Sequence, residues 1–100
     1  MDTEGWNAVS YNIIIKLSLT RAAMKRFILE YKDYNFSSTI KTLLNRAENS
    51  HNVQMFDDLI YELKNLPIEE KFVLELNSNS YRNLITAYTD YMHLVDPNYI

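Results

Sequence analysis

An apolar stripe with helical spacing runs through the first third of the chain. At about 100° per residue, its positions stay within one sector roughly 100° wide for several turns. Such a stripe is typical of a helix that packs against a core. We therefore predict a helix, or two nearly coaxial helices, over residues 5–34. The stripe consists of Trp6, Val9, Ile13, Leu17, Thr20, Met24, Phe27, Tyr31 and Tyr34.

A second apolar line follows the opposite side of the same predicted helix and is interrupted by Arg26. A helix that is apolar on two sides either lies at the centre of a bundle or shares one side with a partner. We hypothesise that part of this line, Leu29 included, is an interface with a second copy or with another protein. The alternative is a central core helix. The line consists of Tyr11, Ile15, Leu19, Ala22 and Leu29.

Three further amphipathic segments follow the first one. One begins after Ser37 or Ser38, whose hydroxyls suit a helix N-cap. The next ends before Pro67, and the last starts with Ser80 as its cap and stops at Asp96. The fold class is therefore predicted to be all-α, a single domain over residues 1–100 built as a small bundle of four to five helices. The apolar positions of the three segments are Ile40, Leu43, Leu44 and Ala47, then Val53, Phe56, Leu59, Ile60 and Leu63, then Tyr81, Leu84, Ile85, Tyr88, Met92 and Val95.

Two stretches, residues 12–19 and residues 72–77, also alternate between apolar and polar positions as β-strands do. The second stretch is interpreted as helical, because Pro67 followed by Glu69 and Glu70 is a favourable helix start. The alternative fold is α+β, in which both stretches are short strands that pair beneath the helices.

The chain contains one glycine and no cysteine among its 100 residues. Glycine usually supplies the positive φ angles of sheet-rich small proteins, so its scarcity favours helices joined by Asn- and Ser-rich connections. We expect such junctions at residues 35–38, 49–52 and 77–80. The absence of cysteine excludes disulfides and Cys-type zinc sites.

The sequence shows neither an N-terminal signal peptide nor a membrane-spanning run. The acidic N-terminus lacks the apolar run of a signal peptide, and nowhere do 18 consecutive apolar residues occur. We therefore expect a cytoplasmic protein that does not bind membranes. Eleven asparagines together with abundant Ile, Lys and Tyr suggest AT-rich coding, as in many phages and low-GC bacteria.

Several catalytic and cofactor-binding motifs need glycines or cysteines that this chain lacks. A single glycine excludes phosphate-cradling loops, dinucleotide fingerprints and the nucleophile elbow. His51 and His93 do not have the spacing of a helical metal pair, and Asp58 and Glu62 fit a solvated acidic face better than an acid–base pair. We predict no enzyme activity, no cofactor and no metal.

The charges divide the chain into a basic and an acidic part. Seven basic and two acidic residues lie between Lys16 and Arg46, and six acidic and two basic residues lie between Asp57 and Glu75. The basic cluster could neutralise phosphates, so DNA binding is an alternative function. Its candidate contacts are Arg21, Lys25, Arg26, Lys32, Lys41 and Arg46.

Residues 12–47 partly resemble the ribbon-helix-helix family of DNA-binding regulators. Asn12, Lys16 and Ser18 alternate with Ile13, Ile15, Leu17 and Leu19, and Ala23, Phe27 and Tyr31 match the spacing of the first helix of that family. The resemblance implies a strand over residues 12–19, with Thr20 as the helix cap. The chain departs from the family pattern at Ile14, which stands among the polar positions, at Asn35, where glycine is usual, and at Ile40, which is out of phase.

The preferred function is that of a small non-enzymatic interaction protein of the inhibitor, immunity, antitoxin or adaptor kind. Aromatic side chains among charges suit interfaces, where a few buried rings dominate the binding energy and charges guide encounter. The expected partner is a larger macromolecule, foremost a protein, and a structural homodimer is the other alternative. The candidate contacts are Tyr61, Glu62, Glu69, Glu70, Tyr91, Tyr99 and Leu29.

Overall fold

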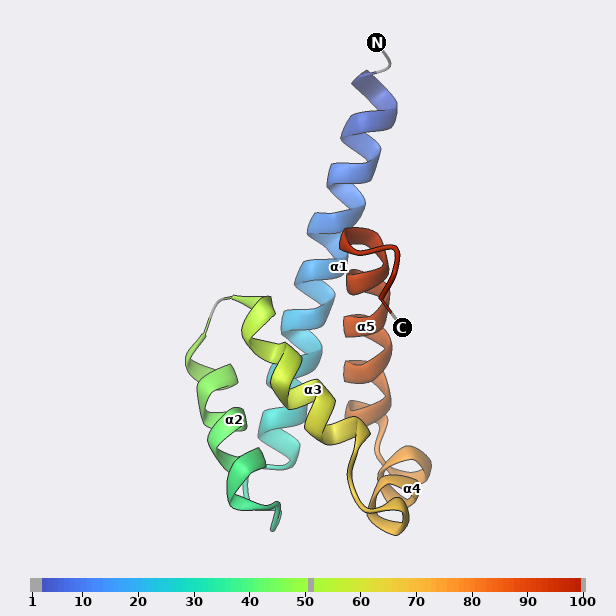
Figure 1. Ribbon diagram of the computed structural model, residues 1–100. Helices are drawn as coiled ribbons and strands as arrows, with labels where there is room; N and C mark the ends of the chain where they lie inside the picture. The colour runs from blue at the N-terminus through green and yellow to red at the C-terminus, as the bar shows by residue number, and fades with distance from the viewer. Residues whose placement is uncertain (1–2, 51, 100) are drawn as a thin grey trace.

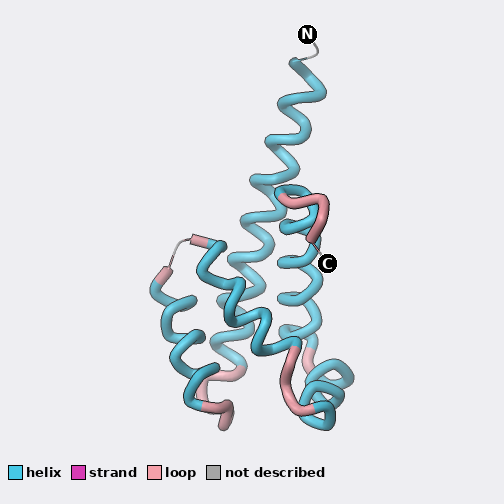
Figure 2. The backbone as a smooth tube through the Cα atoms, in the orientation of Figure 1, coloured by secondary structure: helices cyan, strands magenta, loops and turns pink. Residues whose placement is uncertain are grey.

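The computed structural model describes the backbone of residues 3–50 and 52–99, and within them the regular structure is entirely helical (Figure 2). This confirms the predicted all-α fold class. The elements are α1 (Thr3–Glu30), α2 (Ser38–Asn49), the 3-10 helix η1 (Val53–Phe56), α3 (Asp57–Lys64), α4 (Ile68–Asn77) and α5 (Asn79–Val95). The side chains of Trp6 and Val9, and the whole of His51, lie outside the described part.

The α+β alternative is wrong. Residues 12–19 lie in the middle of α1, and residues 72–77 form the second half of α4. The alternation at 12–19 is local, whereas the stripe through Leu17, Thr20 and Phe27 keeps its helical phase and packs against the core. The strand implied by the ribbon-helix-helix resemblance is therefore absent as well, because its residues belong to a 28-residue helix.

Helix α1 ends four residues earlier than its stripe predicts. After Glu30 the chain turns, with the Tyr34 amide donating to the Tyr31 carbonyl at 3.1 Å. The turn lets the rings of Tyr31, Tyr34 and Phe36 pack against one another in tilted and edge-on geometries, with centroids 4.4 to 5.9 Å apart. Contacts among these aromatic side chains thus replace the last helical turn.

The caps of the next helices follow the serines. Ser37 caps α2, since its hydroxyl accepts from the Ile40 amide at 3.3 Å, as expected. Helix α5 is capped by Ser78 and not by Ser80, because the Ser78 hydroxyl accepts from the Tyr81 amide at 3.1 Å. Ser80 lies in the first turn and is buried against Ser78. All three junctions occur where predicted, yet no described residue has a positive φ, so extended residues make the connections.

The core lies where α1, α2, α3 and α5 meet (Figure 1). Helix α1 packs mainly along α5, while α2 and α3 cover the neighbouring side. Fully buried residues include Phe27 of α1, Leu59 and Leu63 of α3, and Leu84 and Tyr88 of α5. Burying such side chains stabilises the fold by about 1.5 to 3 kcal/mol each.

Two parts of the chain stand outside this core. The N-terminal half of α1 projects beyond the other helices, and α4 sits at the opposite end of the molecule (Figure 1). The extents of 52 × 26 × 21 Å and the radius of gyration of 14.8 Å reflect this projection. A compact domain of this length has a radius of gyration of about 13 Å.

Candidate interaction surfaces

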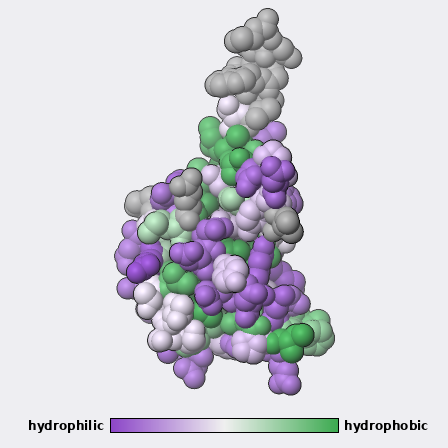
Figure 3. All heavy atoms as spheres, viewed as in Figure 1, coloured by the Kyte–Doolittle hydropathy of each residue, from purple (hydrophilic) through white to green (hydrophobic). Residues whose placement is uncertain are grey.

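Helix α4 presents its apolar side to solvent. Of its ten residues only Leu74 is buried, at 3 % exposure, whereas Ile68 is 83 % and Phe72 60 % exposed. Ile68, Phe72 and Leu76 recur every four residues, so they form one outward stripe, with Val73 beside it. Hydrophobic side chains are visible at the surface over this end of the molecule (Figure 3). We call Ile68, Phe72, Val73 and Leu76 the α4 face.

The α4 face is held in place from behind by a few polar contacts. The Arg82 guanidinium of α5 donates to the carbonyls of Glu75 at 2.6 Å and Leu76 at 3.0 Å. These are carbonyls of the last helical turn, so a cation there stabilises the end of α4. At the start of the helix, partial burial and then the nearby Glu70 carboxylate raise the pKa of Tyr34. Helix α4 is therefore anchored by Leu74 and, at its C-terminal end, by Arg82.

Acidic side chains accompany the α4 face. Glu69 and Glu75 are exposed, and Glu70 is half-buried. Among the described residues of this helix, Lys71 pairs with Glu75, with its Nζ 3.9 Å from Glu75 Oε1. The face therefore combines an apolar stripe with a net negative rim.

The contacts expected from the sequence are distributed over several elements. Glu69 and Glu70 lie in the first turn of α4, beside the α4 face. Tyr61 of α3 is 66 % exposed, while Glu62 next to it is half-buried. Leu29 of α1 is 76 % exposed. The structure thus brings Glu69 and Glu70 to an exposed apolar surface and places Leu29 on a different helix.

Tyr91 and Tyr99 are engaged within the chain itself. Both are half-buried and pack against the core. The Tyr99 ring meets the Tyr88 ring edge-on at 6.0 Å, and Lys64 Nζ lies 5.3 Å from its centroid. These contacts fold the C-terminal segment back over α3 and α5, which gives Tyr99 a structural role.

The basic candidates gather around α1 and α2. Arg21 and Lys25 of α1 rim a hollow of about 350 Å³ between the two helices, whose lining includes Met24, Ile28 and Phe56. A neighbouring hollow of about 240 Å³ has Lys32 and Lys41 on its rim. Glu48 borders both hollows, so their charge is mixed. Arg26 lies elsewhere, beside α5.

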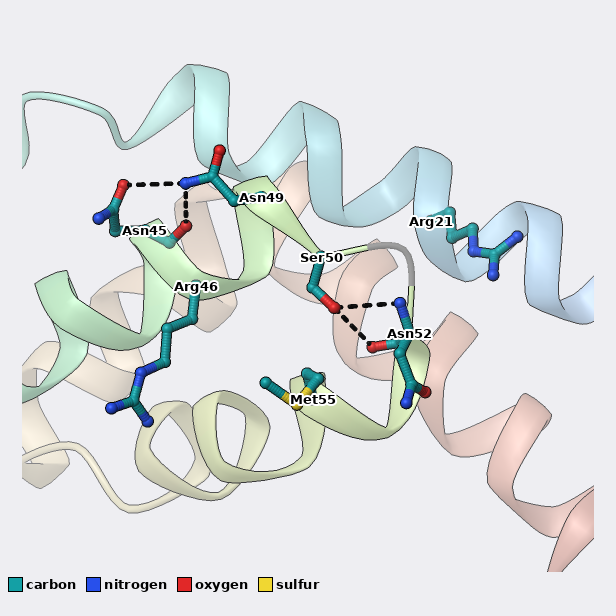
Figure 4. Close-up of a pocket in the computed structure, with 7 residues that line it drawn as sticks. All are labelled: Arg21, Asn45, Arg46, Asn49, Ser50, Asn52 and Met55. Atoms are coloured by element: carbon teal, nitrogen blue, oxygen red, sulfur yellow. Dashed lines mark hydrogen bonds between the residues drawn. The ribbon is translucent and has the colours of Figure 1, made fainter.

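A third, open hollow separates α2 from η1 (Figure 4). Arg46 of α2 extends into it from one side and Met55 from the other, with Arg21 at one end (Figure 4). Its asparagines are already hydrogen-bonded within the chain. Asn49 Nδ2 donates to the Asn45 carbonyl at 2.9 Å. This hollow therefore presents the exposed guanidinium groups of Arg21 and Arg46 beside asparagines that are hydrogen-bonded within the chain.

The second apolar line of α1 is exposed along its described length. Tyr11, Ile15, Leu19, Ala22 and Leu29 all face solvent, and Ile14 is exposed beside them. Helix α1 is consequently not enclosed by the bundle, and the central-helix alternative does not describe it. Figure 3 shows apolar surface on this helix just below the undescribed tip. We call Tyr11, Ile15, Leu19, Ala22 and Leu29 the α1 line.

The candidate acid–base pair shows no special environment. Asp58 is exposed, and the notable carboxylate of α3 is its neighbour Asp57, which accepts a 2.6 Å hydrogen bond from the Tyr88 hydroxyl. Burial, followed by this Asp57 contact, raises the pKa of Tyr88. Among the described residues no three His, Asp or Glu side chains cluster as a metal site. None of the described helices has a stretch long and apolar enough to cross a bilayer.

Comparison with protein-family models, curated protein sequences and solved structures finds no match to this chain.

Proposed function

We propose that this chain is a non-enzymatic interaction module that binds another protein through the α4 face. One observation carries the proposal: Ile68, Phe72 and Leu76, on successive turns of α4, face solvent, while Leu74 is the buried residue of this helix. Exposed apolar residues are common when scattered, but a contiguous apolar patch with a polar rim is typical of binding sites.

The geometry of the α4 face suits the insertion of a helix into a groove. Anchors that recur every three or four residues along one side of a helix are the usual means of this recognition. Phe72, at the centre of the stripe, is the natural anchor, since aromatic residues are enriched among the side chains that dominate binding energy. The flanking Glu69 and Glu75 favour a partner groove with a basic rim.

This proposal retains the interaction role predicted from the sequence and narrows its surface. Glu69 and Glu70 stay as rim contacts, and Tyr61 and Glu62 are assigned no part in the anchor. A stoichiometric binder of this kind, such as an inhibitor, immunity protein, antitoxin or adaptor, needs no reaction centre. We propose the cytoplasm as its place of action.

Co-purification from the native host tests the proposal. A tagged wild-type chain should retain a stoichiometric protein partner, and Phe72→Lys should weaken that complex by about 30-fold or more, the effect of losing a central aromatic anchor. Met55→Lys is the matched control, because Met55 is similarly exposed but lies on η1. A partner that is lost equally from both variants, or from neither, would refute the assignment to α4.

Nucleic-acid binding is the second candidate, favoured by the gathering of Arg21, Lys25, Lys32, Lys41 and Arg46 around the α1–α2 hollows. Such a cluster predicts binding to duplex DNA that weakens steeply with salt. Reversal of Arg21 and Lys25 to Glu would abolish it. Retention of DNA by that variant, or no binding by the wild type at low salt, would eliminate this candidate.

A further inference from the structure

The projecting half of α1 carries apolar residues that nothing in the described chain covers. Tyr11 is 65 % exposed, and Ile14, Ile15 and Leu19 are exposed with it. The arm extends past the ends of the other helices (Figure 1). Most helical stability in proteins comes from packing an apolar face, so an arm of this length is expected to be covered by something.

The α1 line is self-complementary when it is read in opposite directions from Ile15. Four positions away on either side lie Tyr11 and Leu19, and seven positions away lie Ala8 and Ala22. Steps of four and seven residues return to the same side of a helix. Two antiparallel copies that cross at Ile15 therefore place Tyr11 of one copy beside Leu19 of the other, and large residues fall next to large and small next to small.

The charges of α1 favour the same antiparallel register. Glu4 precedes the line, and the basic residues Lys16, Arg21, Lys25 and Arg26 follow its first half. Glu4 and Arg26 each stand eleven positions from Ile15 in the sequence, so antiparallel pairing brings acidic positions to basic ones. Parallel pairing would set like charges together, and flanking charges decide the orientation of paired helices.

The body of the protein offers a place for the arm of the second copy. A hollow of about 320 Å³ runs between α1 and α5 beside Leu19, Ala22 and Arg26. Its α5 side consists of short side chains, among them Asn83 and Thr86. In the antiparallel register this hollow adjoins the position taken by Tyr11 of the second copy, whose ring can enter it.

We propose that α1 pairs with α1 of a second copy of this chain, antiparallel and with the twofold axis at Ile15. The arm of each copy then lies along the body of the other, and the contact is closed and isologous. This pairing does not depend on the proposed role of the α4 face, which lies on another helix.

Cysteine cross-linking tests the register, since the chain has no cysteine of its own. A disulfide needs Cα atoms about 4.4 to 6.8 Å apart. Ile15→Cys, on the axis, should give a covalent dimer under mild oxidation. Tyr11→Cys alone should not, because its two copies are offset by eight residues, about 12 Å along the helix. An equal mixture of Tyr11→Cys and Leu19→Cys should give the mixed dimer.

Leu29→Cys is the matched control, because Leu29 lies on the α1 line and is exposed. In the antiparallel register it should stand roughly 42 Å from its copy along the helix. Self-cross-linking of all these single variants would indicate parallel pairing and overturn the register. The absence of any Ile15→Cys dimer would overturn the proposal outright.

Light scattering tests the association without cross-links. The wild type should have twice the 11.9 kDa chain mass at about 0.1 mM, and Ile15→Glu should have the chain mass with an unchanged helical spectrum. Arg26→Glu should weaken the dimer, and the double variant Glu4→Lys/Arg26→Glu should restore it. A monomeric wild type, or no restoration by the double variant, would contradict the proposal and leave the test of the α4 face untouched.

Discussion

Thr20 is a polar residue fully buried between two helices. Its hydroxyl lies 2.7 Å from the Lys16 carbonyl of its own helix and 3.1 Å from the Ala87 carbonyl of α5. The sequence pattern placed Thr20 in the core stripe of the first helix, and its burial confirms that placement. Because its proton can serve a carbonyl on either helix, Thr20 joins α1 to α5 by more than packing.

Replacing Thr20 with valine keeps the volume but removes the donor. We expect Thr20→Val to lower the free energy of unfolding by about 1 to 2 kcal/mol, the net value of a buried hydrogen bond and its desolvation. Urea denaturation measures this. Thr39→Val, at an exposed position of α2, is the control and should change stability by less than about 0.5 kcal/mol. Equal effects of the two substitutions would refute the role of Thr20.

Tyr81 couples stability to alkaline pH. Its hydroxyl donates to the Leu63 carbonyl at 3.0 Å, and burial, with a smaller effect of the Glu75 carboxylate, raises its pKa to about 12. The unfolded side chain ionises near pH 10. The folded state therefore binds more protons between these values, and stability that is complete below pH 10 is lost as the pH rises toward 12.

Tyr81→Phe should consequently flatten the fall in stability above pH 10. At neutral pH it should cost about 1 to 2 kcal/mol, because the Leu63 carbonyl loses its donor. Thermal melts across pH 8 to about 11.5 record both effects. Tyr61→Phe changes an exposed ring and should alter neither; a wild-type slope in the Tyr81 variant would contradict the coupling.

At the scale of elements, α4 makes the clearest prediction, because substitutions at two of its residues should differ strongly in their effect on stability. Leu74→Ala should destabilise the protein by about 2 to 4 kcal/mol, as for a buried leucine. Phe72→Lys, on the α4 face, should change the free energy of unfolding by less than about 0.5 kcal/mol. Chemical denaturation of the two variants decides the orientation of the helix, and a reversed ranking would show that Phe72 points inward.

The helical elements were predictable because their apolar spacing, serine caps and lack of glycine agree. The short apolar–polar alternations at 12–19 and 72–77 led only to the α+β alternative, which is wrong. Six to eight residues are too few to separate the period of a strand from that of a helix. What the sequence could not give was the direction of α4. Ile68, Phe72 and Leu76 stand four residues apart in the sequence, but this spacing does not say whether the side chains face the core or the solvent. The anchoring by Leu74 and Arg82 from α5 is a tertiary contact, and it decides the direction.

The exposure of the α1 line, in contrast, could be predicted from the sequence. Two apolar lines on one 28-residue helix exceed what a bundle of this size can cover, so the sequence indicated an exposed side. The aromatic candidates Tyr91 and Tyr99 could not be separated from true surface residues, because their burial depends on the return of the C-terminal segment over Tyr88 and Lys64.

At the scale of the whole molecule, the two exposed apolar surfaces lie on different helices and should act independently. Distant substitutions add, so Phe72→Lys should leave the wild-type dimer mass unchanged, and Ile15→Glu should leave the affinity of one α4 face for its partner unchanged within about 0.5 kcal/mol. Light scattering and calorimetry measure the two quantities. A change in mass caused by Phe72→Lys would show that the surfaces belong to one interface.

The claim that the α4 face is a protein-binding surface is tested most directly by a photo-reactive amino acid placed at position 72 in cells of the native host. Position 55, on η1, serves as the comparison because Met55 is exposed to a similar extent. Illumination should join position 72, and not position 55, to one other protein in a single discrete adduct. No adduct at position 72, or equal adducts at both positions, would contradict the account.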